Sequence, residues 1–455
     1  MATDKSDLKN VFRLCDFADT RFVSPVDKPP LPQAECDAVR VYVFDASVWL
    51  AKMLGNGKRH GMDAVMVFVD AIVRAFDTYK NVHTVVAAFD RYQYVTDRKK
   101  PTQAKRRRKR GDGGVPWVWN GTDPIVTVDG VLPPWSGVLG TAAARRAAIQ
   151  EIVDILCARL VLNAGTQVIF DYEHELDANG LSPLVLSPSG KRFDSNLHNA
   201  YGEADLTCQY FAEYFLKHDT EYGPRGAVLL HSVDTDFVPL SMVTIARLCE
   251  SEDEARACPA LYVQLGDVSY DASFANEGFP VLTTRTDERA IFHTEAFNVT
   301  QVALTCHGLF AGKTPFRDGV LSFAAMCFMC GNDYLVGIPG VPRCDTYAAA
   351  RWFAASDLSL VQMAEGVPSL SRELARKLYL YAHAVKYSLL YGLPKQPLWE
   401  IGVDLIKSTH ERRRGAPIDD DVLSEYLEGL AWCLQYAFDI AVHPPSLPPT
   451  SSPDA

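Results

Sequence analysis

The chain has 455 residues, of which 48% are hydrophobic and 22% charged, and this composition is typical of a globular protein with two or three domains' worth of core. The formal net charge of −11 taken alone argues against nucleic acid as a partner. The opening MATDKSDLKN has no apolar core and the apolar runs are too short to span a bilayer, so we expect neither a signal peptide nor a membrane anchor. Eleven cysteines without paired spacing indicate a reducing compartment, and we expect an intracellular protein of the nucleus or cytoplasm.

Two kinds of apolar pattern alternate along the first part of the chain. Short continuous runs predict buried strands, and apolar residues spaced three or four apart predict helices between them. This alternation predicts an α/β fold with a mostly parallel central sheet flanked by helices. After about residue 295 the strand signals stop, so we expect a helical C-terminal region. The predicted strands lie at 39–44, 83–89, 167–170, 227–232 and 261–265, and the predicted helices at 62–79, 142–162, 320–330, 371–391 and 420–440.

Two segments interrupt this pattern. Residues 111–140 are rich in glycine and proline and contain Trp117, Trp119 and Trp135, so they predict a loop or small subdomain. Its tryptophans could stack on bases or could form a small local core, and the sequence leaves both open. Residues 171–200 form a second polar interruption.

A basic cluster precedes the tryptophan-bearing segment. Nine of the thirteen residues from Arg98 to Arg110 are Lys or Arg, and without those nine charges the remaining chain sums to −20. A local cluster on an acidic protein indicates one defined anion site. A solvated charged helix and a nuclear-localisation signal remain alternatives.

Acidic residues follow several of the predicted strands. The carboxyl ends of parallel strands share one edge of a sheet, so topology alone should gather the acids that follow them. Two further acids begin the helix in GEADLTCQYF, and another lies beyond a predicted helix end at Gly331. Each acid has an ordinary explanation, because turns favour Asp and the first turn of a helix favours acids. The set is Asp45, Asp90, Glu203, Asp205, Asp234, Asp236 and Asp333.

Such a set requires compensating positive charge. Two carboxylates about 4 Å apart repel by roughly 4 kcal/mol at an effective dielectric of 20. Oxygen ligands select hard ions, so we expect two Mg²⁺ or Mn²⁺ ions that activate a water and stabilise a leaving oxygen. With the basic cluster nearby, the inferred substrate is a nucleic-acid backbone.

These motifs resemble the flap endonuclease family of 5′ nucleases, the XPG-like enzymes with a PIN-like fold. The matching pieces are FDAS at 44–47, AFD at 88–90, AKRRRKR from Ala104, GEAD from Gly202, DTD from Asp234 and GNDYLVGIPGV from Gly331. They cover roughly residues 40–345, in the family's order.

The resemblance implies residue roles. It implies that one metal is held by Asp45, Asp90, Glu203 and Asp205, and a second by Asp205, Asp234, Asp236 and Asp333, partly through water. It implies catalytic roles at the scissile phosphate for Lys99 and Arg106, although Pro101 intervenes. We expect further nucleic-acid contacts from Lys100, Lys105, Arg107, Arg108, Gly337 and Gly340.

The segment from Gly337 to Pro342 looks like the family's helix-two-turn-helix, which often holds a potassium ion, although a plain Gly-Pro turn is the alternative. The predicted domains are an α/β nuclease core at 1–295 with a basic arch-like segment at 98–140, a helix-two-turn-helix region at 296–355, a helical region at 356–442 and a disordered tail at 443–455.

The function expected from the resemblance is metal-dependent cleavage of branched or flapped DNA. Residues 425–438, EYLEGLAWCLQYAF, are similar to a helix of 5′ to 3′ exoribonucleases, so RNA remains an alternative substrate. A catalytically silent nucleic-acid-binding scaffold is a third possibility. We expect a monomer, and no sliding-clamp motif is evident near the C-terminus.

Overall fold

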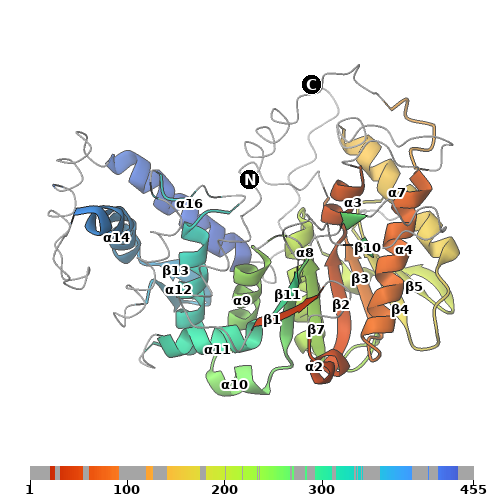
Figure 1. Ribbon diagram of the computed structural model, residues 1–455, viewed down its shortest axis with the longest axis horizontal. Coiled ribbons are helices and arrows are strands. Elements are labelled where there is room, and N and C mark those ends of the chain that lie inside the picture. Colours follow the sequence, from red (N-terminus) through yellow and green to blue (C-terminus); the bar gives the residue numbers. More distant parts are fainter. Residues whose placement is uncertain are drawn as a thin grey trace. The chain divides into compact units, whose positions relative to one another are not determined.

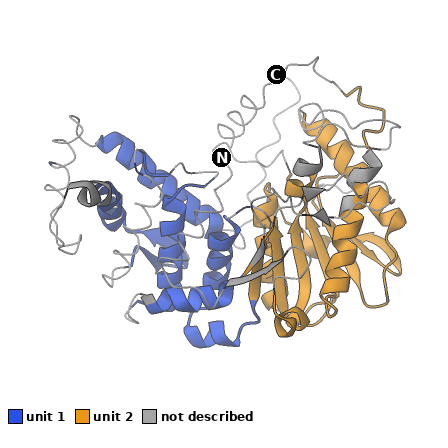
Figure 2. Ribbon diagram, viewed as in Figure 1, with its two compact units in different colours: residues 1–21, 234–260, 297–439 blue, residues 22–233, 261–296, 440–455 orange. Residues whose placement is uncertain are grey.

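The computed structural model divides into two units, which are described separately (Figure 2). Unit 1 comprises residues 1–21, 234–260 and 297–439, and unit 2 comprises 22–233, 261–296 and 440–455. The structure describes residues 21–25, 31–54, 61–91, 119–126, 141–174, 181–199, 201–217, 219–232, 234, 236–266, 269–270, 282–283, 293–309, 314–332, 335, 337–339, 341, 359–391, 408 and 419–438.

A parallel sheet forms the centre of unit 2 (Figure 1). Its five parallel strands are those predicted from the sequence, and every residue of β3 and β7 is buried, so both faces are covered. The predicted α/β class with a mostly parallel central sheet is therefore confirmed. In spatial order the strands are β8 (Leu261–Leu265), β7 (Ala227–Ser232), β2 (Val39–Asp45), β3 (Thr84–Ala88) and β4 (Gln167–Asp171).

The sheet continues beyond β4 as an antiparallel hairpin. Strands β5 (Leu184–Ser187) and β6 (Gly190–Phe193) pair with each other, and β5 pairs with β4. The sequence predicted only a polar interruption at 171–200, and that prediction is wrong for this part. The reason is that β6 is an edge strand whose first three residues are exposed, so it carries no apolar run.

The other edge carries two more strands. The order within the described residues is β1-β11-β8-β7-β2-β3-β4-β5-β6, with β1 at Arg21–Pro25 and β11 at His293–Asn298. A separate short pair is formed by β9 (Ser269–Tyr270) and β10 (Leu282–Thr283).

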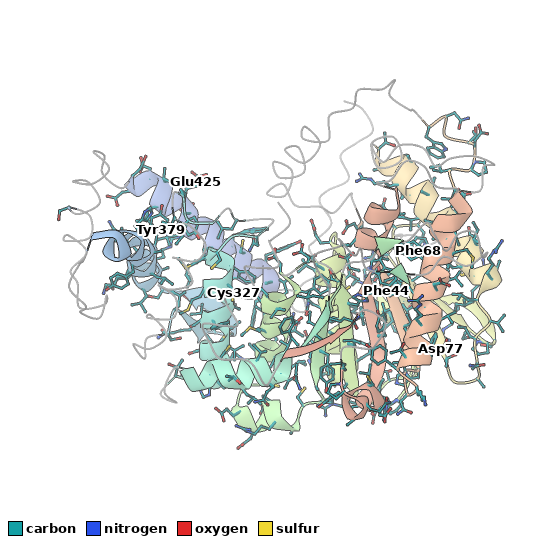
Figure 3. All side chains as sticks on the ribbon, viewed as in Figure 1. Phe44, Phe68, Asp77, Cys327, Tyr379 and Glu425 are labelled. Atoms are coloured by element: carbon teal, nitrogen blue, oxygen red, sulfur yellow. The ribbon has the colours of Figure 1, made fainter. Side chains whose placement is uncertain are left out.

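Helices of unit 2 contribute aromatic side chains to the core. Phe44 of β2 stacks on Trp49 with ring centroids 4.5 Å apart and lies 6.4 Å from Phe68 (Figure 3). Thr141 caps the predicted helix at 142–162, because its hydroxyl accepts from the N–H of Ala144 at 3.1 Å. The helices are α2 (Gln33–Ala38), α3 (Ala46–Leu54), α4 (Gly61–Thr78), α7 (Ala142–Arg159), the short 3₁₀ helix η4 (Ser195–Leu197) and α8 (Ala204–Lys217).

Unit 1 is mostly helical. Helix α12 (Phe316–Met329) packs against α9 (Phe237–Leu248), α11 (Val299–Leu309) and α16 (Asp420–Phe438). The remaining helices are α10 (Glu252–Ala257) and α14 (Arg372–Tyr391). Among the described helices, none combines the length and apolar character needed to cross a membrane.

Unit 1 also contains a hairpin that the sequence analysis missed. Strands β12 (Val361–Ala364) and β13 (Val367–Leu370) are antiparallel, so the expectation that strands stop after residue 295 is wrong. Their turn residues Glu365 and Gly366 both have positive φ, as a two-residue hairpin turn of type I′ requires. Strands of four residues give too short a pattern to stand out.

Helix α12 ends as predicted. Gly331 follows the C-cap residue Cys330 and has a φ of +101°, a left-handed conformation that glycine adopts without strain. The helix begins earlier than predicted, at Phe316 after the N-cap Pro315. The predicted tail at 443–455 lies outside the described residues.

Candidate active site

Acidic residues meet at the carboxyl edge of the sheet of unit 2. Asp45 ends β2 and is in register with Ala88 on β3, and Asp90 follows Ala88 by two residues. On the other side of β3, Ala88 is in register with Asp171, the last residue of β4. The edge predicted for Asp45 and Asp90 is therefore confirmed, and Asp171 is an additional acid there.

The FDAS segment joins two of these strand ends. Asp45 is 5% exposed, and its Oδ1 accepts a hydrogen bond from the N–H of Val48 at 3.1 Å, which caps the start of α3. Ser47 Oγ lies 2.6 Å from the backbone nitrogen of Asp90, whose N–H it accepts. The motif thus holds Asp45 and Asp90 in fixed relation.

Asp90 is also bonded to the helix that carries the other two acids of unit 2. Its Oδ1 accepts from the N–H of Ala204, the first residue of α8, at 2.8 Å. Glu203 directly precedes the helix and is 1% exposed, and Asp205 lies in its first turn. Glu203 and Asp205 therefore lie at the start of a helix, as the sequence predicted.

A buried thiol lies within the electrostatic influence of these carboxylates. Burial raises the pKa of Cys208 well above 9.0, and the negative charges of four carboxylates raise it further. Three of them are predicted metal ligands, and they come from different elements. In order of effect, the four are Asp45 of β2, Asp205 of α8, Asp171 of β4 and Asp90 after β3.

Asp171 is compensated within the protein. The buried guanidinium of Arg91 pairs with its Oδ1, and Asn199 Nδ2 donates to its Oδ2 at 2.5 Å. Burial raises the pKa of Asp171, and both contacts oppose that increase. Sequence analysis assigned no role to Ser47, Arg91, Asp171 and Asn199. Ser47 lies within the FDAS motif and Asp171 directly follows a predicted strand, so the sequence carried a signal for both. Arg91 and Asn199 gave none, because a single Arg or Asn outside a recognised pattern gives no signal.

Asp234 and Asp236 belong to unit 1, where they precede α9. Asp234 Oδ1 accepts from the N–H of Asp236 at 3.1 Å, and the carbonyl of Asp236 accepts from the N–H of Leu240. Within the part of the chain that the structure describes, which excludes Asp333, no three His, Cys, Asp or Glu side chains form a group that could hold a metal ion. The assignment of the acids as ligands stays a prediction.

Most predicted nucleic-acid contacts lie outside the described residues. These are Lys99, Lys100, Lys105, Arg106, Arg107, Arg108 and Gly340, together with most of the arch-like segment. Gly337 is described, and a Cβ there would lie 2.8 Å from the carbonyl oxygen of Cys330. Its close packing on residue 330 explains a glycine at this position without a ligand.

Part of the tryptophan-bearing segment is described. Glu151 Oε2 on α7 accepts from the N–H groups of Ile125 and Val126 at 2.8 and 2.9 Å, so this stretch is anchored to the helix. Trp119 Nε1 donates to the carbonyl of Asp123 at 2.8 Å. The indole N–H thus takes part in a local turn, and the base-stacking alternative stays a prediction.

His231 at the end of β7 is part of the core. Its Nδ1 is bonded to the hydroxyl of Tyr42, and its ring packs edge-on against Trp49 with centroids 5.4 Å apart. Its contacts are those of a structural histidine.

No model of a known protein family matches the chain, and no curated protein matches it. The chain is similar to two solved structures, both of the catalytic core of Rad2 in complex with DNA substrate. Each shares 12% sequence identity with the chain. The first alignment covers 94% of this chain and 84% of that chain with a TM-score of 0.38. The second covers 92% and 98%, with a TM-score of 0.33. A likeness this distant does not assign the chain to a family.

Proposed function

We propose that the protein is a divalent-metal-dependent phosphodiesterase. The observation that carries this proposal is the placement of Asp45 and Asp90 at the carboxyl edge of the sheet, with Asp90 bonded to the N–H of Ala204, the residue between Glu203 and Asp205. Glu203 adds a fourth carboxylate next to Asp205 and is 1% exposed.

The donors fit a hard cation. All four side chains offer carboxylate oxygens, which favour Mg²⁺ or Mn²⁺ over zinc. In this proposal Asp45, Asp90, Glu203 and Asp205 hold one ion, and the set for the second ion is Asp205, Asp234, Asp236 and Asp333. When bound, a pair of ions supplies an activated water and stabilises the leaving oxygen of a phosphodiester.

The chain's own residues prepare this site. Ser47 Oγ accepts from the backbone N–H of Asp90 at 2.6 Å, and the N–H of Ala204 donates to its carboxylate at 2.8 Å, so both the backbone and the side chain of Asp90 are held within the protein. The cap that Asp45 provides to Val48 orients its carboxylate in the same way. Such preorganisation lowers the entropy lost when an ion binds.

More specifically, we propose a 5′ nuclease that acts on branched or flapped DNA as a monomer. The basic cluster at 98–110 supports a nucleic-acid substrate, with Lys99 and Arg106 proposed to contact the scissile phosphate. A potassium ion at 337–342 would add a duplex contact. RNA is the competing substrate, motivated by the sequence of α16.

The test is cleavage of three 5′-labelled substrates: flap DNA, single-stranded DNA and single-stranded RNA. Each is incubated with Mg²⁺, Mn²⁺ or chelator, and Asp45→Asn serves as the control because Asn retains an acceptor for Val48. We expect flap cleavage near the junction that needs metal and is lost in the control. Cleavage of RNA alone would establish the RNA enzyme, and no cleavage of any substrate would overturn the proposed activity.

A further inference from the structure

A buried polar network lies beneath the acids of unit 2. Arg91 directly follows Asp90, and its side chain is 0% exposed. Its Nη1 donates to the carbonyl and to the Oδ1 of Asn199, and its Nη2 contacts Asp171 and donates to the carbonyl of Leu181 at 3.2 Å. One guanidinium therefore joins the end of β4 to two separate segments that follow it.

The backbone extends this network to the start of α8. The N–H of Arg91 donates to the carbonyl of Gly202 at 2.8 Å, and Asp90 Oδ1 accepts from the N–H of Ala204 at 2.8 Å. Residues 90 and 91 are thus bonded on both sides of Glu203. Asn199, held by the Arg91 side chain, lies four residues before Glu203 on the same loop.

Such a network is an expensive way to gain stability. The cost of burying an ion pair commonly offsets its attraction, and apolar side chains of similar volume stabilise a core at least as well. A planar guanidinium does offer several donors at fixed angles, which apolar side chains and lysine do not. Its donors hold Asp171, Leu181 and Asn199 together.

We propose that Arg91, with Asp171 and Asn199, is a positioning network that sets the affinity of the metal site. It acts by fixing Glu203 and Asp90 relative to each other, and it contacts neither metal nor substrate. This inference rests on the proposed metal-dependent function. Removing groups that orient metal ligands typically weakens metal binding by about 10- to 100-fold.

The test compares two network variants with a control elsewhere in unit 2. Arg91→Lys keeps a positive charge opposite Asp171 but loses the planar guanidinium with its several donors. Asn199→Ala removes the side chain that bonds to Arg91 and Asp171. The control is Tyr222→Phe, which removes a bond to the buried Asp194; the Tyr222 carbonyl is bonded to Thr84 at the opposite end of β3 from Asp90. All are measured by Mn²⁺ calorimetry below their unfolding temperatures, and by cleavage as a function of Mn²⁺.

We expect the Mn²⁺ dissociation constant to rise about 10-fold or more in both network variants, as for other groups that orient metal ligands. Cleavage at saturating Mn²⁺ should change little, and Tyr222→Phe should bind Mn²⁺ as the wild type does. If a network variant folds and its Mn²⁺ affinity is unchanged, or if Tyr222→Phe loses as much Mn²⁺ affinity as the network variants, the positioning role is overturned. The proposed metal-dependent function would not be affected by either result. No Mn²⁺ uptake by the wild type would overturn the proposed function, and with it this role.

Discussion

Asp90 accepts a hydrogen bond from the backbone N–H of Ala204 at 2.8 Å, which ties the exit of β3 to the first residue of α8. The same carboxylate is one of the four whose charge raises the pKa of Cys208. Asp90 therefore has a structural role at the start of a helix and a proposed role as a metal ligand. The two roles depend on different properties, because a hydrogen bond needs an acceptor atom and an ion needs charge.

Two substitutions at Asp90 separate these roles. Asp90→Ala removes both, and the lost cap should lower the free energy of unfolding by about 1 kcal/mol. Asp90→Asn keeps an acceptor for Ala204, so its stability should match the wild type while its metal-dependent cleavage is lost. Denaturant unfolding and the flap assay measure the two effects. Full activity in Asp90→Asn would show that the charge is not used.

Substitution of Asp205 tests whether the carboxylates repel each other. Asp205→Asn removes one of the charges around Cys208, while the helix start loses a favourable charge worth about 0.3–1 kcal/mol. We expect cleavage to fall by about 10³-fold, equivalent to about 4 kcal/mol. In chelator the melting temperature should stay unchanged or rise. A lower melting temperature with normal cleavage would leave Asp205 a helix-start residue only.

The sheet edge was predictable because strand and helix periods differ and parallel strands end on the same side. That argument placed Asp45 and Asp90 together without knowledge of any distance. It also placed Asp205 at a helix start, where α8 begins at Ala204. Local pattern and topology are thus sufficient for residues whose position follows directly from the end of an element.

The supporting residues were not predictable in the same way. Arg91 contacts Asp171, Leu181 and Asn199, which are 80 to 108 residues away along the chain, so only the folded structure brings them together. The β5–β6 hairpin was missed for another reason, since its exposed edge strand lacks an apolar run. Pairing between distant segments, and edges that face water, leave little trace in local sequence.

The turn after α12 predicts a steric effect at Gly337. A Cβ at this position would lie 2.8 Å from the carbonyl oxygen and 3.3 Å from the carbonyl carbon of Cys330, and backbone cannot move aside cheaply. Gly337→Ala should therefore lower the free energy of unfolding by about 1–3 kcal/mol. Gly308→Ala is the matched control, because a Cβ there meets nothing within 4 Å. Equal stabilities of the two variants would contradict the close approach.

The last prediction concerns pH and the bond between Tyr222 and Asp194. Burial raises the pKa of Asp194, but hydrogen bonds from the Tyr222 hydroxyl, the N–H of Asn196 and Arg192 lower it more, so the net pKa is below 3.8. A carboxyl whose pKa is lower in the folded than in the unfolded state stabilises the fold at every pH above its unfolded-state pKa. That stabilisation is lost as the pH falls through the folded pKa.

Tyr222→Phe removes one of these donors and should raise the pKa of Asp194 toward its ordinary value. At pH 7 the free energy of unfolding should fall by about 1.5–3 kcal/mol, the range for a hydrogen bond to a charged group. The difference from the wild type should shrink as the pH is lowered below 3.8, because Asp194 is protonated first in the folded variant and then, as the pH falls through its lower folded pKa, in the folded wild type. Denaturant unfolding of both proteins between pH 7 and pH 3 measures this trend. A difference that stayed constant over the whole range would mean that Tyr222 stabilises the fold through packing and not through the charge of Asp194.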